Sequence, residues 1–372
     1  MRNVKQYGVG VKDGLAQCIH TLRLQLEAGM RRANKDDPIC ALVTDLSNAF
    51  NELGRDRLFQ MLLEEAEENG LWNSRLQDGQ ELPVPACLRP WFSIFLVKYS
   101  AVTTVRYFRH DGTYVDVACA AGVHQGCPFG SAAFSAALHV SLSIVMRAHP
   151  DVLTVAYMDN VTLTGTVTKA YAAFDDLCPS IKEDLQLRIN LSESFVYIPC
   201  DSEDDGEHQS ITQAYEAIMQ QRRQAGKMVL PLQTRGMVIL GTAMGNDSYV
   251  QQQHEKWMPK VQGQIDKLKD MTDNLMHARF LKMHLGAQLL SKLRTEMPIG
   301  GQFQDGAYGK VDRKLAVAFL ERALHEGWSP DAEFGAHGVS TEMLIGSVQA
   351  PISEGGFDVG GLQLTREAHF HP

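Results

Sequence analysis

The chain has 372 residues, of which 44% are hydrophobic and 21% are charged. This composition excludes a largely disordered chain and is ordinary for a globular protein with a sizeable core. Its net charge of −9, from 35 basic and 44 acidic residues, argues against a generally basic nucleic-acid-binding protein, although a local basic stripe can act within an acidic chain.

The seven cysteines are odd in number, widely spaced and include no C-x-x-C pair. Neither a zinc site nor a disulfide framework is therefore expected, and reduced thiols indicate an intracellular compartment. The sequence does not distinguish nucleus, cytoplasm and organelle. No apolar run approaches the length of a membrane span and no secretory signal opens the chain, so no membrane span is expected.

The first third of the chain combines helical periodicity with alternating patterns. Apolar residues at helical spacing predict a helix over 13–33, with Asp13 as its cap. A buried strand is expected over 39–46. Asp111-Gly112, between two alternating segments, is the signal of a hairpin. The other predicted elements here are helices over 57–68 and 91–99 and hairpin strands over 101–108 and 113–118.

The middle of the chain contains a second hairpin signal. A glycine-marked loop over 122–130 leads into an apolar, alanine-rich helix over 131–148. Short strands over 152–157 and 161–164 then flank Met158-Asp159-Asn160, which places polar residues at a hairpin tip. The remaining predicted elements are helices over 169–184, 211–225, 255–295 and 310–325, strands over 195–198 and 236–244, and an acidic surface loop over 201–207.

Asp45 lies at the end of the first predicted buried strand, and Asp159 lies between the two strands of the second hairpin. Carboxylates at the ends of adjacent strands can hold a pair of divalent cations, and oxygen ligands suit Mg²⁺ or Mn²⁺. Such cations activate an attacking hydroxyl and neutralise charge on a leaving pyrophosphate in nucleotidyl transfer. Asp45 or Asp159 alone would more often be a loop-capping residue, but the ordered pair favours a catalytic metal site.

An ordered series of motifs surrounds these aspartates, and it resembles the reverse transcriptase domain of non-long-terminal-repeat retrotransposons. The segments that carry the resemblance are QYGVG at 6–10, DLSNAFN at 45–51 (motif A), GVHQGCPFG at 122–130 (motif B), AYMDNVTL at 156–163 (motif C), 190–195 (motif D), GMVILG at 236–241 (motif E) and the glycine-containing region 351–362.

The resemblance implies an α/β fold, a right-hand polymerase palm with partial fingers and a helical thumb. The implied domains are partial fingers with a pre-palm helix over 1–40, the palm over 41–250, the thumb over 251–330 and a C-terminal extension over 331–372. A fingers-like hairpin region over 83–121 lies within the palm range.

The same resemblance implies roles for individual residues. Asp45 and Asp159 would ligate Mg²⁺ or Mn²⁺, with Asn160 at the remaining catalytic position. The ring of Phe50 would crowd a 2′-hydroxyl and favour deoxynucleotides, although ordinary core packing is the alternative. Gln125 and Gly126 would lie against the incoming nucleotide and template.

Four departures from the family pattern all argue for weakened catalysis. Asn160 stands where the family has a second Asp, and an amide is a poorer ligand for a hard cation. Cys127 replaces the Asp of motif B. Glu193 replaces a Lys that lies close to the triphosphate in the family, unless Lys182 or Arg188 takes that role. The basic fingers motifs expected before Gln6 are absent, and triphosphate binding relies on them.

The region 256–294 is basic within this acidic chain, with eight basic and three acidic residues. A helical thumb with such a surface can follow a phosphate backbone, although a solvated amphipathic helix pair explains the pattern equally well. The residues expected to bind nucleic acid are Lys256, Lys260, Lys267, Arg279, Lys282 and Lys292.

Two functions follow from the motifs and their departures. The first is a reverse-transcriptase-derived protein with impaired catalysis, which serves as a structural or nucleic-acid-binding subunit of a larger assembly such as a ribonucleoprotein. Its expected partners are RNA or an RNA/DNA duplex, together with proteins of that assembly. The alternative is an active RNA-directed DNA polymerase that uses two Mg²⁺ ions.

Overall fold

The computed structural model describes residues 4–32, 34–56, 58–59, 97–99, 101–124, 127–200 and 204–269, together with individual residues between 271 and 320. The chain divides into two compact units, Met1–Thr234 and Arg235–Pro372.

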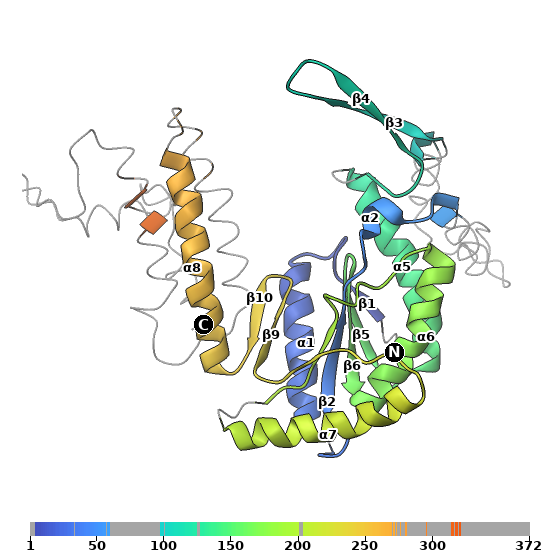
Figure 1. The fold of residues 1–372 in the computed structure, drawn as a ribbon, viewed down its shortest axis with the longest axis vertical. Coiled ribbons are helices and arrows are strands. Elements are labelled where there is room, and N and C mark those ends of the chain that lie inside the picture. The colour runs from blue at the N-terminus through green and yellow to red at the C-terminus, as the bar shows by residue number, and fades with distance from the viewer. Residues whose placement is uncertain are drawn as a thin grey trace, which may run out of the picture. The chain divides into compact units, whose positions relative to one another are not determined.

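The first unit is built on a mixed six-stranded sheet (Figure 1). Its spatial order is β1-β5-β6-β2-β7-β8, with antiparallel pairs in the centre and parallel pairs at both edges. The strands are β1 (Val4–Gln6), β2 (Ile39–Thr44), β5 (Leu153–Tyr157), β6 (Asn160–Thr166), β7 (Phe195–Tyr197) and β8 (Leu232–Gln233).

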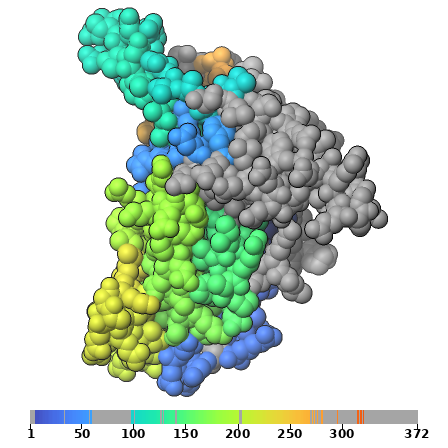
Figure 2. Space-filling view, turned by 90° about the vertical axis from the view of Figure 1, so that its right-hand side faces the viewer, coloured from blue at the N-terminus to red at the C-terminus, as the bar shows by residue number. Residues whose placement is uncertain are grey.

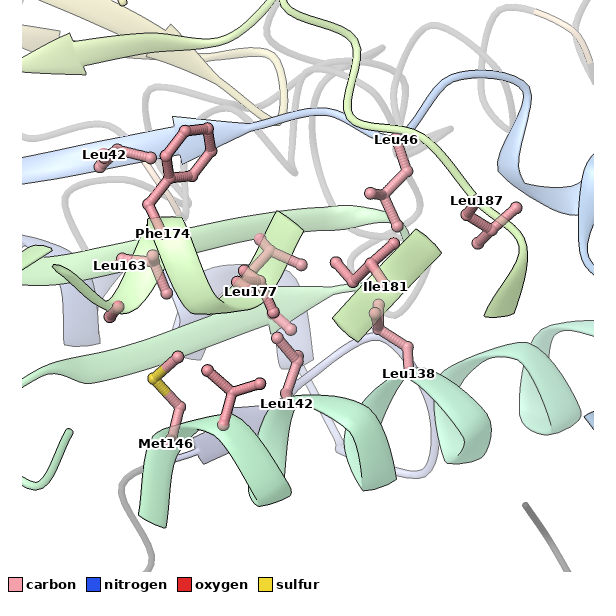
Figure 3. Packing of buried hydrophobic residues seen from close by; sticks show 14 of the residues in the cluster. Leu42, Leu46, Leu138, Leu142, Met146, Leu163, Phe174, Leu177, Ile181 and Leu187 are labelled. Atoms are coloured by element: carbon pink, nitrogen blue, oxygen red, sulfur yellow. The ribbon is translucent and has the colours of Figure 1, made fainter. Parts of the chain in front are cut away.

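Helices cover both faces of this sheet. Side chains of β2 alternate between the faces. Leu42 joins a buried cluster with residues of α5 (Pro128–Ala148) and α6 (Val167–Leu185), as Figure 3 shows. The neighbouring Val43 is also buried and points to the opposite face, where α1 (Gly14–Met30) contacts β2, β5 and β6. The result is a three-layer α/β/α arrangement with the strands in its middle.

The β3–β4 hairpin extends away from this layered body (Figures 1 and 2). Its strands, β3 (Thr103–Phe108) and β4 (Tyr114–Cys119), pair as predicted around Asp111-Gly112. Arg106 forms a bidentate ion pair with Asp116 across the strands, and its guanidinium lies 4.1 Å from the centre of the Tyr114 ring. These contacts add to the main-chain pairing of a hairpin whose side chains are nearly all exposed.

The second unit contains a short hairpin and a long helix in its described part. β9 (Gly236–Ile239) and β10 (Thr242–Gly245) pair antiparallel, and α8 (Asp247–Lys269) packs on β10. The prediction of one strand over 236–244 is therefore wrong. Leu240 and Gly241 reverse the chain with φ angles of 51° and 78°, values that suit a tight hairpin turn.

Other predicted elements are confirmed, some with shifted ends. The structure contains the helix after Asp13, the strands β2, β5, β6 and β7, and the helices α5 and α6. Asp13 occupies the N-cap position of α1, but its side chain makes no capping hydrogen bond. Four other predicted helices lie mostly outside the described residues, namely those over 57–68, 91–99, 255–295 and 310–325. Only α8, residues 97–99 and scattered positions of these ranges are described.

The helix α7 (Asp205–Gln224) begins six residues earlier than predicted. The prediction of an acidic loop through Glu207 is therefore wrong from Asp205 onward. Asp204 accepts a hydrogen bond from the main-chain N–H of Gly206, and Asp205 and Glu207 lie in the first turn. Acidic side chains at this end are stabilised by the unpaired N–H groups and the positive end of the helix dipole.

The segment Phe129–Ala148 within α5 is long and apolar enough to span a membrane by length and composition alone. The expectation that no apolar run approaches spanning length is therefore wrong for this stretch. Within the structure 59% of its apolar 18-residue window is buried, and the Leu138, Leu142 and Met146 side chains point into the core in Figure 3. This burial is typical of a core helix.

A polar network joins α7 to α6 beside the core. Arg222 donates two hydrogen bonds to Asp175, at 2.6 and 3.1 Å, and stacks on Tyr171 at 4.0 Å from its ring centre. Lys227 donates to the same carboxylate at 2.9 Å. Burial raises the pKa of Asp175, but hydrogen bonds and charges of Arg222 and Lys227 outweigh burial and hold it below its ordinary value.

We expect Asp175→Asn to lower the free energy of unfolding at pH 7 by about 1–3 kcal/mol, because a mostly buried guanidinium loses its anionic partner. A depressed carboxylate pKa contributes stability above the unfolded value, about 3.9, and this contribution disappears as the pH falls through the folded value. The deficit of the variant should therefore shrink below about pH 4. Urea unfolding at pH 7 and pH 3 measures it.

The exposed ion pair between Lys169 and Asp151 supplies the control. Asp151→Asn should stay within about 0.5 kcal/mol of the wild type at pH 7, because solvent screens that pair. Equal losses in the two variants would contradict a special contribution from Asp175.

Candidate functional site

Strand register brings Asp45 and Asp159 to one place. β2 pairs antiparallel with β6, with Thr44 opposite Val161. Asp45, which follows β2, therefore lies beside Asn160, the first residue of β6. Asp159 precedes Asn160 in the two-residue turn that joins β5 to β6, since Tyr157 pairs with Asn160. Both carboxylates thus lie at the same end of the central strands, and both residues are half-buried.

The pKa of Asp159 is raised in part because the Asp45 carboxylate is near. Burial raises the pKa of its carboxyl, and the nearby charge of Asp45 raises it further. A hydrogen bond with the Asn160 side chain acts in the opposite direction without cancelling the rise. The side-chain amide of Asn160 thus forms a hydrogen bond with the Asp159 carboxylate and does not add a third carboxylate to the site.

A turn from the motif D region holds Asp45 in place. The Asn190 amide donates to the Asp45 carboxylate at 3.4 Å, and the Asn190 main-chain N–H donates to the Asp45 carbonyl at 2.8 Å. The Asp45 N–H donates to Ser194 Oγ at 3.3 Å, and that hydroxyl donates to the Asn190 carbonyl at 2.7 Å. The roles of Asn190 and Ser194 were not predicted from the sequence, because only the tertiary fold brings them to Asp45.

The side chains at this place that could hold a divalent cation are two carboxylates. Two half-buried carboxylates of like charge lie together, and oxygen ligands of this kind suit Mg²⁺ or Mn²⁺. Among the described residues, no group of three His, Cys, Asp or Glu side chains gathers at a single point. Asp45 and Asp159 are the residues that would hold the cation.

The nucleotide-binding predictions meet different outcomes. The Phe50 ring stacks on Phe134 of α5, with centres 4.7 Å apart and an angle of 22° between the planes. It is half-buried against the core, so core packing accounts for its position while a role in nucleotide selection stays a prediction. Gln125 and Gly126 lie outside the described residues.

The motif B loop contacts motif A through its main chain. Gly122 has a φ of 72°, and its N–H donates to the Leu53 carbonyl at 2.8 Å. The N–H of Val123 donates to the Phe50 carbonyl at 2.6 Å. A Cβ on Gly122 would lie 2.4 Å from the carbonyl oxygens of Phe50 and Asn51, so this close approach requires glycine.

Cys127 occupies an unusual environment at the start of α5. Lys98 Nζ donates to its sulfur at 3.2 Å. Burial raises the pKa of the thiol, but hydrogen bonds from Tyr99, Lys98 and the main chain of Phe129 and Gly130 outweigh burial and hold the pKa at about 7. The thiol that stands at the position of the motif B Asp thus has a lowered pKa.

The other charged candidates lie at the surface. Glu193 is exposed in the turn that holds Asp45, and Lys182 and Arg188 are exposed nearby in the sequence. Lys256, Lys260 and Lys267 are exposed on α8 of the second unit. At about 100° per residue they fall within about 40° around the helix axis, opposite the buried Val261 and Ile265. Arg279, Lys282 and Lys292 lie outside the described residues.

No protein-family model matches the chain, and none of the curated proteins matches it. Among solved structures, it is similar to telomerase from Candida albicans in complex with the TWJ fragment of telomeric RNA. The TM-score is 0.38 and the identity 12%, over 87% of this chain and 50% of that chain.

Two telomerase structures from Candida tropicalis give similar values. The complex with the TWJ fragment of telomeric RNA has a TM-score of 0.34 and 11% identity, over 91% of this chain and 53% of that chain. The apo form truncated from the C-terminal domain has a TM-score of 0.36 and 15% identity, over 54% and 37%. The chain thus spans about half or less of these proteins, and TM-scores below 0.5 do not establish a common fold.

We expect Gly122→Ala to lower the free energy of unfolding by about 2–5 kcal/mol, because strain from a positive φ adds to overpacking against two carbonyl oxygens. Gly226→Ala is the matched control, with a φ of 67° and no atom within 4 Å of the added Cβ. It should cost only about 1–2 kcal/mol. Denaturant unfolding measures both values, and equal losses would contradict the close contact between motifs A and B.

Proposed function

We propose that the chain is a reverse-transcriptase-derived nucleic-acid-binding subunit of a larger assembly, with a polymerase palm whose catalysis is impaired. The observation that carries this proposal is the carboxylate site at the end of β2 and the β5–β6 turn. Asp45 and Asp159 come together there, but Asn160 carries an amide where motif C of the resembling family has a further carboxylate. The site therefore retains the arrangement of a nucleotidyl-transfer centre while lacking part of its negative charge.

Impairment follows from what nucleotidyl transfer requires. Bound cations would lower the pKa of an attacking hydroxyl and neutralise the leaving pyrophosphate. Asp45 and Asp159 would hold one cation, and Asn160 adds no charge for a second. Glu193, exposed in the turn that orients Asp45, would repel a triphosphate rather than attract it. These features favour a binding role for the palm over turnover.

The second candidate function is active RNA-directed DNA polymerisation with Mg²⁺ or Mn²⁺. The observation that favours it is the carboxylate pair itself, because burial of two like charges without a cation is unfavourable. An amide at the third position still offers one neutral oxygen to a cation. The two functions differ in whether the site binds cations tightly enough for chemistry.

We expect the chain to bind Mn²⁺ weakly and to extend no primer. Asp45→Asn should abolish Mn²⁺ binding, because a single carboxylate remains. Asn160→Asp should tighten binding roughly tenfold, since ligand charge sets cation affinity. Electron paramagnetic resonance of free Mn²⁺ measures binding, and primer extension on an RNA template measures chemistry.

Each variant answers a different question about the site. Asp45-dependent primer extension by the wild-type chain would overturn the impaired function in favour of the polymerase. Equal Mn²⁺ affinity in the wild-type and Asp45→Asn chains would show that these carboxylates hold no cation.

We expect the three α8 lysines to contribute to RNA binding. Replacing Lys256, Lys260 and Lys267 with Gln should weaken binding to a short RNA/DNA hybrid and reduce the slope of log affinity against log salt by about 2–3, because each lost phosphate contact removes roughly one released counterion. Fluorescence anisotropy across a salt series measures the slope.

A control with the same change in charge uses exposed lysines of the first unit. Replacing Lys12, Lys35 and Lys169 with Gln leaves α8 intact. An equal fall in slope for the two triple variants would reveal a general charge effect and contradict a binding stripe on α8.

A further inference from the structure

β1 lies beside the turn that carries Asp159. It pairs in parallel with β5, with Gln6 opposite Ala156. The N–H of Tyr7 continues this pairing by donating to the Ala156 carbonyl at 2.8 Å. The regular ladder then stops, because β5 ends at Tyr157 and the chain reverses through Met158 and Asp159.

The Gln6 side chain continues the pairing where the main chain leaves off. Its Oε1 accepts hydrogen bonds from the N–H groups of Met158, at 3.2 Å, and Gly8, at 2.9 Å. Its Nε2 donates to the Met158 carbonyl at 3.4 Å. One amide group therefore contacts both main-chain polar groups of Met158, as a strand residue would.

Met158 needs such support because it has a φ of 55°, a conformation that residues other than glycine rarely adopt. Contacts from two further sides restrict it. A Cβ on Gly8 would lie 2.6 Å from the Met158 nitrogen, and Ser135 of α5 donates to the Met158 sulfur at 3.8 Å. The turn is thus fixed through Met158, one residue before Asp159.

We propose that Gln6 is a positioning residue, whose amide fixes the Met158 turn and thereby holds the Asp159 carboxylate beside Asp45 for a shared divalent cation. This inference rests on the cation site of the proposed function. It adds a residue that is distant in sequence and touches neither carboxylate. A side chain that merely packs at the end of β1 would not need to satisfy both the N–H and the C=O of one turn residue.

The test compares Gln6→Met, which is similar in size but makes no such hydrogen bonds, with Lys5→Ala at an exposed position of the same strand. Hydrogen exchange of the full chain reports on peptides that cover the β5–β6 turn. Electron paramagnetic resonance reports Mn²⁺ affinity. We expect Gln6→Met to speed exchange at the turn roughly tenfold and to weaken Mn²⁺ binding about tenfold, a typical effect of losing a residue that orients a ligand. Lys5→Ala should change neither.

Gln6→Glu separates hydrogen bonding from packing and serves if Gln6→Met does not fold. It keeps an oxygen that accepts from Met158 and Gly8, but a second carboxylate oxygen replaces the donor and faces the Met158 carbonyl. Exchange at the turn should be faster than in the wild type but slower than in Gln6→Met, because the two accepted hydrogen bonds remain. Exchange as fast as in Gln6→Met would overturn the role assigned to the Gln6 oxygen.

The outcomes distinguish this inference from the proposed function. Unchanged exchange at the turn in Gln6→Met overturns the inference, and so does faster exchange with unchanged Mn²⁺ affinity. If the wild-type chain binds no Mn²⁺, the cation site itself fails and the positioning role fails with it. If the wild-type chain binds Mn²⁺ and Gln6→Met binds it equally tightly, the cation site stands and only the inference fails.

Discussion

The antiparallel register between β2 and β6 is the constraint on which the candidate site depends. Six residue pairs fix it, from Ile39 opposite Thr166 to Thr44 opposite Val161. Side chains alternate along a strand, so a slip of one residue would exchange the two buried faces of β2. Because both faces lie under helices, this slip is costly. The packing of the core therefore determines that Asp45 meets the Asp159 turn.

The same packing explains why the carboxylates lie at the strand ends. The middle of β2 is fully buried, so a charge there would be desolvated on both sides. Half-buried positions at the end of the sheet leave both carboxylates partly in contact with solvent. Amides accompany both carboxylates, Asn160 beside Asp159 and Asn190 beside Asp45. Neutral donors of this kind stabilise carboxylates without an added cation.

The sequence predicted the elements that carry strong periodicity or a turn signal, including the Asp111-Gly112 hairpin and the strands around Asp159. It failed where turn chemistry was unusual. Leu240 is not a residue expected at positive φ, so the β9–β10 turn was missed. The acidic residues before α7 were taken for a loop because their capping role depends on the helix that follows. The contacts of Gln6, Asn190 and Ser194 depend on tertiary pairing and leave no local signal.

The amide at position 160 links stability to function. A third carboxylate beside Asp45 and Asp159 would add like-charge repulsion in a half-buried site, and a cation would have to offset it. With Asn160 the repulsion involves two charges, and an amide hydrogen bond opposes the rise in the pKa of Asp159. An amide at this position therefore lessens the dependence of the folded site on a bound cation. The turn and the strand register are held by main-chain and amide contacts.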